Sequence, residues 1–158
     1  MSQTGSISIL IDKTARTLHI YRAAALKRSA RVALGRNALA DKVKEGDCAT
    51  PLGEFYVCAR NPRSKFFMSL CLSYPNREHA ARGLQSGLIS TREHTLILAA
   101  LDERRMPPQD TRLGGEIYIH GELPAGRDWT HGCIALDNPS MQELFDIAAI
   151  GTSVSIRP

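Results

Sequence analysis

Two histidines, one cysteine and several glycines cluster between residues 117 and 135, a segment that reads IYIHGELPAGRDWTHGCIA. A short apolar run leads into His120 and Gly121, and after a turn-rich loop the chain continues as Thr130-His131-Gly132-Cys133. A thiol attacks a carbonyl as its thiolate, and a neighbouring imidazole takes the proton and later returns one to a leaving amine. The segment therefore predicts a cysteine acyl-transfer site.

The residue types suggest different roles within this site. Cys133 is the expected nucleophile. We expect His120 to be the base, because a strand end holds its ring rigidly and the Gly121 carbonyl can fix its tautomer. His131 lies two residues before Cys133, which puts both side chains on one face of an extended chain but not of a turn. We therefore expect His131 to shape the site or to assist.

The residues before the cysteine suit binding of a substrate and of its transition state. Gly132 permits unusual backbone angles, so the N–H groups of Gly132 and Cys133 can point at a developing oxyanion, worth ~3 kcal/mol per donor. Thr130 belongs to the same turn, and Arg127 and Trp129 add a guanidinium and an aromatic ring that suit a polar peptide with a free carboxylate. A packing role for Trp129 and a surface position for Arg127 remain open.

Two other interpretations of the segment are a zinc site and a purely structural cluster. His120, His131 and Cys133 are possible zinc ligands, but no carboxylate stands at a metal-motif spacing and no second thiol is close. We expect no metal and no cofactor. The other cysteines, Cys48, Cys58 and Cys71, form no C-x-x-C pair, and the last two lie in apolar strand-like runs typical of buried, inert thiols.

Composition indicates one globular domain over residues 1–158, with 43% hydrophobic residues and a net charge of +4. The basic residues are scattered, and pairs such as Lys27-Arg28 and Arg104-Arg105 are typical of a solvated face, so we expect no nucleic-acid partner. We also expect a monomer. No apolar run is long enough to span a membrane, and no export signal is visible in this chain. Retention inside the cell, export by another route and a missing leader all stay open.

The apolar periodicity predicts a mainly β or α+β domain with a helical insertion around residues 76–106 and a short C-terminal helix. Strands are expected at 6–11, 17–22, 30–34, 55–59, 66–73, 116–120 and 153–157. In the insertion, Asn76 caps one helix and Ser90 begins a capping box before the stripe Leu96, Ile97, Ala100 and Leu101. Asn138-Pro139 is expected to cap and begin the last helix, with Met141, Leu144, Phe145 and Ala148 on its apolar face.

The pattern His120-Gly121, a loop, and then Thr130-His131-Gly132-Cys133-Ile134 resembles the catalytic signature of the L,D-transpeptidase (YkuD-type) family. The resemblance covers most of the chain from Ser6 onward, and it is nearest to the ErfK/YafK-like murein enzymes of Gram-negative bacteria. Further matching stretches are Lys44–Asp47, Thr50–Phe55, Ser69–Ala80, Gly114–Gly121, Asp128–Thr130 and Gly151-Thr152. Ala135 departs from the pattern, since many members have arginine or asparagine there.

This resemblance implies a β-sandwich-like catalytic domain that acts on the peptide stems of peptidoglycan, with roles in cell-wall biogenesis and cell shape. It implies that Cys133 attacks the carbonyl at the L-centre of diaminopimelate and expels D-alanine, with His120 as base and then acid and without a metal. An amine acceptor gives transpeptidation and water gives L,D-carboxypeptidase or amide-hydrolase activity. The family also implies a periplasmic or envelope location. A catalytically inactive cell-wall-binding module of the same fold is the alternative.

Overall fold

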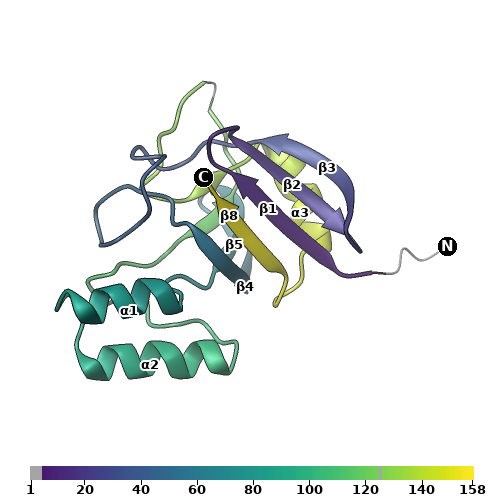
Figure 1. Cartoon of the computed structure of the whole chain (residues 1–158). Helices are drawn as coiled ribbons and strands as arrows, with labels where there is room; N and C mark the ends of the chain where they lie inside the picture. The colour runs from purple at the N-terminus through teal and green to yellow at the C-terminus, as the bar shows by residue number, and fades with distance from the viewer. Residues whose placement is uncertain (1–4, 125) are drawn as a thin grey trace.

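One curled sheet of eight strands surrounds an apolar core, and three helices lie outside it (Figure 1). This computed structural model describes residues 5–124 and 126–158, and all counts refer to that part of the chain. The strands are β1 (Ile7–Asp12), β2 (Thr17–Arg22), β3 (Ala25–Arg31), β4 (Gly53–Ser64), β5 (Phe67–Leu72), β6 (Tyr118–His120), β7 (Ile134–Ala135) and β8 (Ser153–Arg157). The helices are α1 (Arg77–Gln85), α2 (Thr91–Asp102) and α3 (Asn138–Ile147). The expected mainly β fold, helical insertion and C-terminal helix are confirmed.

The sheet curls because β4 belongs to two differently oriented halves. The strand order is β3-β2-β1-β8-β4-β5-β6-β7. The first residues of β4 pair with β8, and the rest of this twelve-residue strand pairs with β5 after a register shift. At the ends of the order, Ala33 exchanges two backbone hydrogen bonds of 3.0 and 2.9 Å with Ala135 in β7. The segment after β3 is thus hydrogen-bonded to β7, and the sheet closes around its core.

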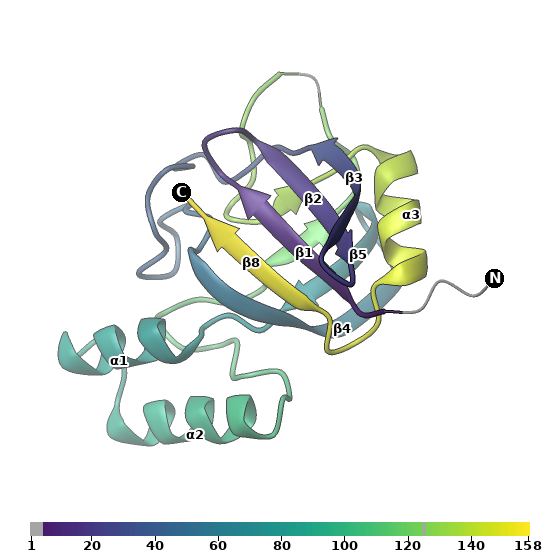
Figure 2. The same ribbon diagram turned by 45° about the vertical axis from the view of Figure 1, so that its right-hand side comes forward.

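Alternating side chains fill the space inside the curl. Most strands turn one face inward, whereas β3 is exposed along almost its whole length. Helix α3 covers one open side of the sheet (Figure 2). The buried residues include Ile9, Ile11, Leu18, Ile20, Phe55, Val57, Leu70, Leu72, Ile119, Ile134, Leu144 and Val154. The strand expected at 30–34 ends earlier, at Arg31, and Val32, Ala33 and Leu34 are all buried because this segment lies between two parts of the fold.

The helical insertion is built as its capping residues predict. Asn76 accepts the first N–H groups of α1, and Ser90 with Glu93 forms a complete capping box at α2. Ile97 and Ala100 are buried in a small second core. The prediction for Leu96 is wrong, since this residue is 48% exposed.

The cap of α3 lies one residue before the expected position. Asp137 is the N-cap, and its carboxylate accepts the N–H of Ser140 at 2.9 Å. Asn138 is instead the first helical residue, because its side chain is bound to Glu122 in the segment after β6. The amide oxygen of Asn138 accepts the Glu122 N–H at 2.8 Å, which ties α3 to the strand that carries His120.

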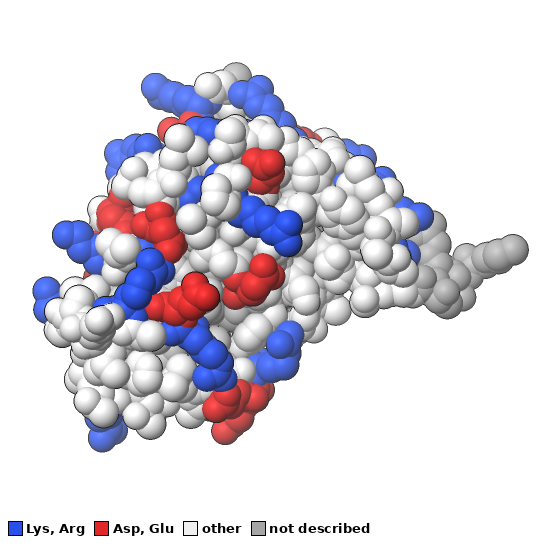
Figure 3. All heavy atoms as spheres, viewed as in Figure 1, with Lys and Arg blue, Asp and Glu red and all other residues white. Residues whose placement is uncertain are grey.

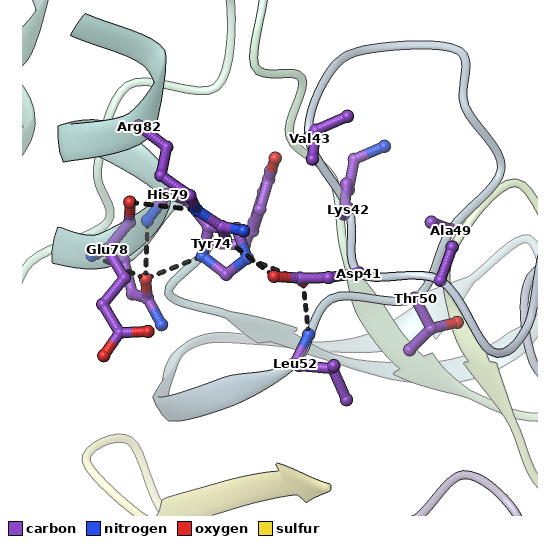
Figure 4. A network of polar contacts seen from close by, with 12 residues as sticks. Asp41, Lys42, Val43, Ala49, Thr50, Leu52, Tyr74, Glu78, His79 and Arg82 are labelled. Carbon is purple, nitrogen blue, oxygen red and sulfur yellow. Dashed lines mark hydrogen bonds and ion pairs between the residues drawn. The ribbon is translucent and has the colours of Figure 1, made fainter. Parts of the chain in front are cut away.

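A buried polar network attaches α1 to the loop before β4 (Figure 4). The carboxylate of Asp41 accepts from His79 Nε2 at 3.0 Å, Arg82 Nη2 at 2.7 Å and Leu52 N at 2.9 Å. Burial raises the pKa of Asp41, but the hydrogen bonds from these partners outweigh it and hold that pKa well below its usual range. The other ring nitrogen of His79 lies 2.7 Å from Asn76 Oδ1, which already accepts backbone N–H groups. Both ring nitrogens of His79 therefore face side-chain oxygens, which fix the orientation of the ring.

Lys13 holds the same loop against the sheet from the other side. Its side chain is fully buried, and Nζ donates to the carbonyls of Ala40 at 2.7 Å and Thr50 at 2.5 Å. Burial lowers the pKa of Lys13 to about 8. A neutral amine still has two N–H groups, so both carbonyls keep their donor when the proton is lost.

None of the described helices is long and apolar enough to cross a bilayer. Lys and Arg side chains are mixed with Asp and Glu on the face shown in Figure 3. The positive net charge is therefore not gathered into a single patch on that face.

The buried amine predicts a pH dependence of stability. The unfolded chain holds the Lys13 proton up to about pH 10.5 and the folded chain only to about pH 8, so the free energy of unfolding should rise with pH between these values. Lys13→Met lacks this gain, and the stability gap between wild type and variant should widen from pH 7.5 to 9.5 in urea titrations. Lys27→Met, at an exposed position, is the control. A gap that stays constant with pH would contradict the prediction.

Candidate active site

One face of the half-sheet β5-β6-β7 collects the side chains that can do chemistry. Leu70, Ile119 and Ile134 point into the core, so the residues beside them point the other way. The register places Ser69 opposite His120 and Cys71 opposite Tyr118. Since β6 and β7 are parallel with Ile119 beside Ile134, Cys133 comes next to Tyr118. The imidazole of His120 and the thiols of Cys71 and Cys133 thus share one surface, although Cys71 is far from the other two in the sequence.

These side chains form the floor of a cavity of about 620 Å³. One wall is the hairpin between β4 and β5, with Arg60, Lys65 and Phe66. Another part of the wall is the loop from Trp129 to His131. Cys133 and His120 both line this cavity, as a common site requires.

The His120 ring is held on three sides. It is 2% exposed, and its Nδ1 lies 2.7 Å from the carbonyl oxygen of Gly121. Phe66 stacks on the ring at 4.6 Å, and Trp129 meets it edge-on at 5.8 Å. Burial lowers the pKa of His120, which favours the neutral ring. Because Nδ1 faces a carbonyl acceptor, it carries the hydrogen of the neutral ring, and Nε2 is left as the basic atom.

The Cys133 thiol is neutral and has partners other than His120. Sγ lies 3.3 Å from the carbonyl oxygen of Glu116, to which it donates, and 3.4 Å from the N–H of Tyr118, from which it accepts. Burial, together with the negative charge of Glu116, raises the pKa of Cys133 to about 11. The direct thiol–imidazole contact expected from the sequence is not among the hydrogen bonds of the described residues. His120 lies two residues beyond Tyr118, ~7 Å further along the strand, so the thiol must turn to reach it.

Glu116 holds the thiol through a strained backbone. Its φ is +56°, a left-handed conformation that costs a non-glycine residue about 1 kcal/mol or more. Its N–H donates to Gln109 Oε1 at 2.7 Å, and Gly115 packs so closely on Gln109 that a Cβ there would lie 2.7 Å from the Gln109 carbonyl oxygen. The carbonyl that receives the Cys133 thiol is therefore fixed in direction.

Thr130 and Gly132 build the turn before the nucleophile rather than an oxyanion site. The Thr130 hydroxyl accepts the Gly132 N–H at 3.1 Å and donates to the Cys133 carbonyl at 2.7 Å. The expectation that the Gly132 N–H is free for an oxyanion is thus wrong, since Thr130 already uses it. Gly132 has φ +139°, and a Cβ there would lie 2.8 Å from the Ala49 carbonyl oxygen. Glycine is required at this position for a close approach.

The remaining predicted residues divide between the cavity and the surface. Trp129 packs on His120 and Phe66, and its buried Nε1 has no hydrogen-bond partner among the described residues. His131 is exposed at the cavity wall. Arg127 is exposed and lies outside the described lining of the cavity, so the structure does not bring it to the site. In the described part of the chain, no three His, Cys, Asp or Glu side chains converge as metal ligands.

Sequence reasoning missed three residues that shape this site. Asp128 binds Leu34 N at 3.0 Å and Arg16 at 2.8 Å, which anchors the Trp129 loop to the β1–β2 turn. Phe66 stacks on His120 from another strand pair, and Glu116 holds the thiol. The only local signal was the Gly114-Gly115 pair before Glu116, which permits an unusual backbone.

Comparison with models of protein families identifies one family. Residues 6–156 match the model of the YkuD family, described as the L,D-transpeptidase catalytic domain. No curated protein matches the chain in sequence.

Solved structures show the same fold at low identity. The helical cell shape determining protein Pgp2 from Campylobacter jejuni is 22% identical, with a TM-score of 0.62 over 97% of this chain and 48% of that one. An L,D-transpeptidase from Mycobacterium smegmatis is 12% identical, with a TM-score of 0.59 over 98% and 59%. One from Xylanimonas cellulosilytica is 17% identical, with a TM-score of 0.57 over 99% and 63%. The chain therefore spans less than two thirds of the length of each.

The Thr130 hydroxyl predicts a stability difference between two substitutions. Thr130→Val leaves the buried Gly132 N–H without an acceptor, which should lower the free energy of unfolding by about 1–3 kcal/mol in urea titrations. Thr130→Ser keeps the hydroxyl and should lose clearly less. Equal stability of the valine and serine variants would show that the hydroxyl does not hold the turn.

The raised pKa of Cys133 predicts slow alkylation of the free protein. The rate of iodoacetamide modification, followed by peptide mass spectrometry, should rise about tenfold per pH unit from pH 7 to 10, because only the thiolate reacts. His120→Gln should leave this profile unchanged, since the ring does not bind the resting thiol. An apparent pKa below about 8 that rises in His120→Gln would show instead that the imidazole already takes the proton in the free protein.

Proposed function

The chain belongs to the L,D-transpeptidase family, and from that membership we propose that it transfers acyl groups of peptidoglycan stem peptides through a thioester on Cys133. The observation that carries the proposal is the shared cavity of Cys133 and His120, in which the His120 tautomer leaves Nε2 free to accept a proton. Membership of this family supports an enzyme of this kind, and the catalytic roles of Cys133 and His120 are part of the proposal.

The reaction begins with a movement of the thiol. A substrate that enters the cavity displaces Cys133 Sγ from the Glu116 carbonyl and turns it toward His120. His120 Nε2 takes the thiol proton while the sulfur forms a bond to the carbonyl carbon of the stem peptide. Catalytic hydrogen bonds are often long in free enzymes and tighten only when substrate is bound.

The proton then leaves with the first product. His120 gives it to the departing amine of D-alanine as the C–N bond breaks, and a Cys133 thioester remains. An acceptor amine or water, deprotonated by His120, attacks this thioester and restores the thiol. The Cys133 N–H remains the expected oxyanion donor, because that of Gly132 is taken by Thr130.

The hairpin wall of the cavity carries the basic side chains of Arg60 and Lys65. Lys65 extends from the β4–β5 hairpin over the Phe66 ring at 5.2 Å, and Phe66 in turn stacks on His120. A free carboxylate on the leaving residue fits this basic side, close to the imidazole that protonates the departing amine. Since peptidoglycan lies outside the cytoplasmic membrane, we place the working site in the cell envelope.

A non-catalytic wall-binding module is the second candidate. It is favoured by one observation, which is that the resting thiol is neutral and bound to Glu116 and Tyr118 rather than to His120. In that case the cavity binds stem peptides without turnover.

Product analysis separates these two candidates. Incubated with purified disaccharide-tetrapeptide muropeptides, the wild type should release D-alanine, seen by mass spectrometry as a shortened, exchanged or cross-linked stem. Cys133→Ala should abolish release, and His120→Gln should lower kcat by roughly 10²–10⁴. Cys48→Ser, at a half-buried position outside the described lining of the cavity, should keep wild-type rates. Binding of muropeptides by wild type and Cys133→Ala alike, with no product from either, would establish the wall-binding module.

A further inference from the structure

Two cysteines outside the proposed catalytic pair face each other across β4 and β5. Val57 pairs with Leu72 and Ala59 pairs with Cys71, so Cys58 is the extra residue of a β-bulge. In such a bulge two residues on one strand oppose a single residue on the other, and here Cys58 and Ala59 oppose Cys71. Directly paired Cα atoms, such as those of Ala59 and Cys71, lie about 4.5–5.5 Å apart, and Cys58 shares the bulge with Ala59. Disulfides span Cα separations of about 4.4–6.8 Å, so the bulge places Cys58 near the distance at which it can be linked to Cys71.

The Cys58 thiol also contacts the backbone of Cys71, and both thiols are reduced. Cys58 Sγ lies 3.5 Å from the carbonyl oxygen of Cys71, and Cys71 Sγ lies 3.7 Å from that of Leu72. Cys58 is half-buried, whereas Cys71 is 3% exposed and reaches the catalytic cavity as part of its lining. An external reagent therefore meets Cys58 before Cys71.

We propose that Cys58 and Cys71 are a redox modification site, at which a disulfide-bearing oxidant links β4 to β5 beneath the catalytic cavity. The Cys58 thiolate attacks one sulfur of the oxidant RS–SR, forming a mixed disulfide and expelling RS⁻. The Cys71 thiolate then attacks Cys58 Sγ, forming the Cys58–Cys71 bond and expelling the second RS⁻. The two cysteine thiols together lose two electrons, and the oxidant takes them up and becomes two RS⁻ groups. The two protons from the cysteines pass to these groups, which gives two RSH.

The environment of each sulfur suits this order of events. The polar contact with the Cys71 side chain lowers the pKa of Cys58, which makes Cys58 the attacking group. The same contact, with burial added, raises the pKa of Cys71, which keeps it a thiol until a partner sulfur is at hand. Cys71 is thus the resolving cysteine.

Geometry separates this pair from the catalytic thiol. Cys71 in β5 and Cys133 at β7 have β6 between them, so their backbones are about 10 Å apart, beyond the reach of a disulfide. The link leaves Cys133 free. It joins the base of the hairpin whose far end carries Phe66, the residue stacked on His120. Oxidation therefore restrains the hairpin wall of the cavity without consuming the nucleophile.

The test uses the full wild-type chain and oxidised glutathione, followed by alkylation of remaining thiols and peptide mapping without reduction. We expect a peptide pair joined through Cys58 and Cys71, alkylated Cys48 and Cys133, and a higher melting temperature that returns to its starting value with reductant. Cys48→Ser should form the same link. A mapped bond that involves Cys133, or a glutathione adduct that persists on Cys58 beside a free Cys71 thiol, would overturn the proposal.

A second variant separates attack from resolution. In Cys71→Ser, glutathione should remain attached to Cys58, because no resolving thiol is present. In Cys58→Ser, Cys71 should stay free of glutathione, since its thiol is buried and its pKa is raised. Glutathione on Cys71 in that variant would contradict the assigned order.

Discussion

The parallel pairing of β6 with β7 is the constraint on which the candidate site depends. Only two residue pairs define it, Ile119 with Ile134 and His120 with Ala135, so the pairing cannot hold the strands by itself. Other contacts supply the missing support: Ala33 binds Ala135 from the outside, the Thr130 hydroxyl closes the preceding turn, and Gly132 lies against Ala49. The loop that carries Ala49 is in turn held by Lys13. A chain of buried contacts thus fixes where the nucleophile lies.

The electrostatics of the resting site follow from its burial. A thiolate–imidazolium pair without substrate would place two charges in a poorly solvated cavity, which is costly unless each has good partners. The free protein instead keeps Cys133 protonated and His120 neutral, and it satisfies each with a backbone carbonyl. Glu116 and Gly121 therefore define a neutral resting state. Transfer of the proton belongs to the bound state, in which the substrate replaces these contacts.

Local signals in the sequence predicted what depends on local geometry. The caps at Asn76 and Ser90, the β1–β2 hairpin and the buried face of α3 all follow from residue types at short spacing. Contacts set by pairing of distant strands were not predictable: Phe66 on His120 and Asp128 with Arg16 join residues that share no pattern. The Gly132 N–H was misassigned for a different reason: its acceptor, the Thr130 hydroxyl, is only two residues away, but this contact depends on how the turn folds back. Arg127 fits a local motif but lies on the exposed side of its loop.

Closure of the sheet also bears on how this protein meets other molecules. The end strands of an open sheet offer unpaired backbone groups to which a strand of another chain can add, and this is a common route to aggregation. Here the two bonds between Ala33 and Ala135 occupy backbone groups of β7, and Arg28 of β3 binds Ser140 and Glu143 of α3. β7, the last strand in the order of the sheet, is consequently unavailable as a template for strand addition. Another molecule that binds at β7 must do so through side-chain contacts.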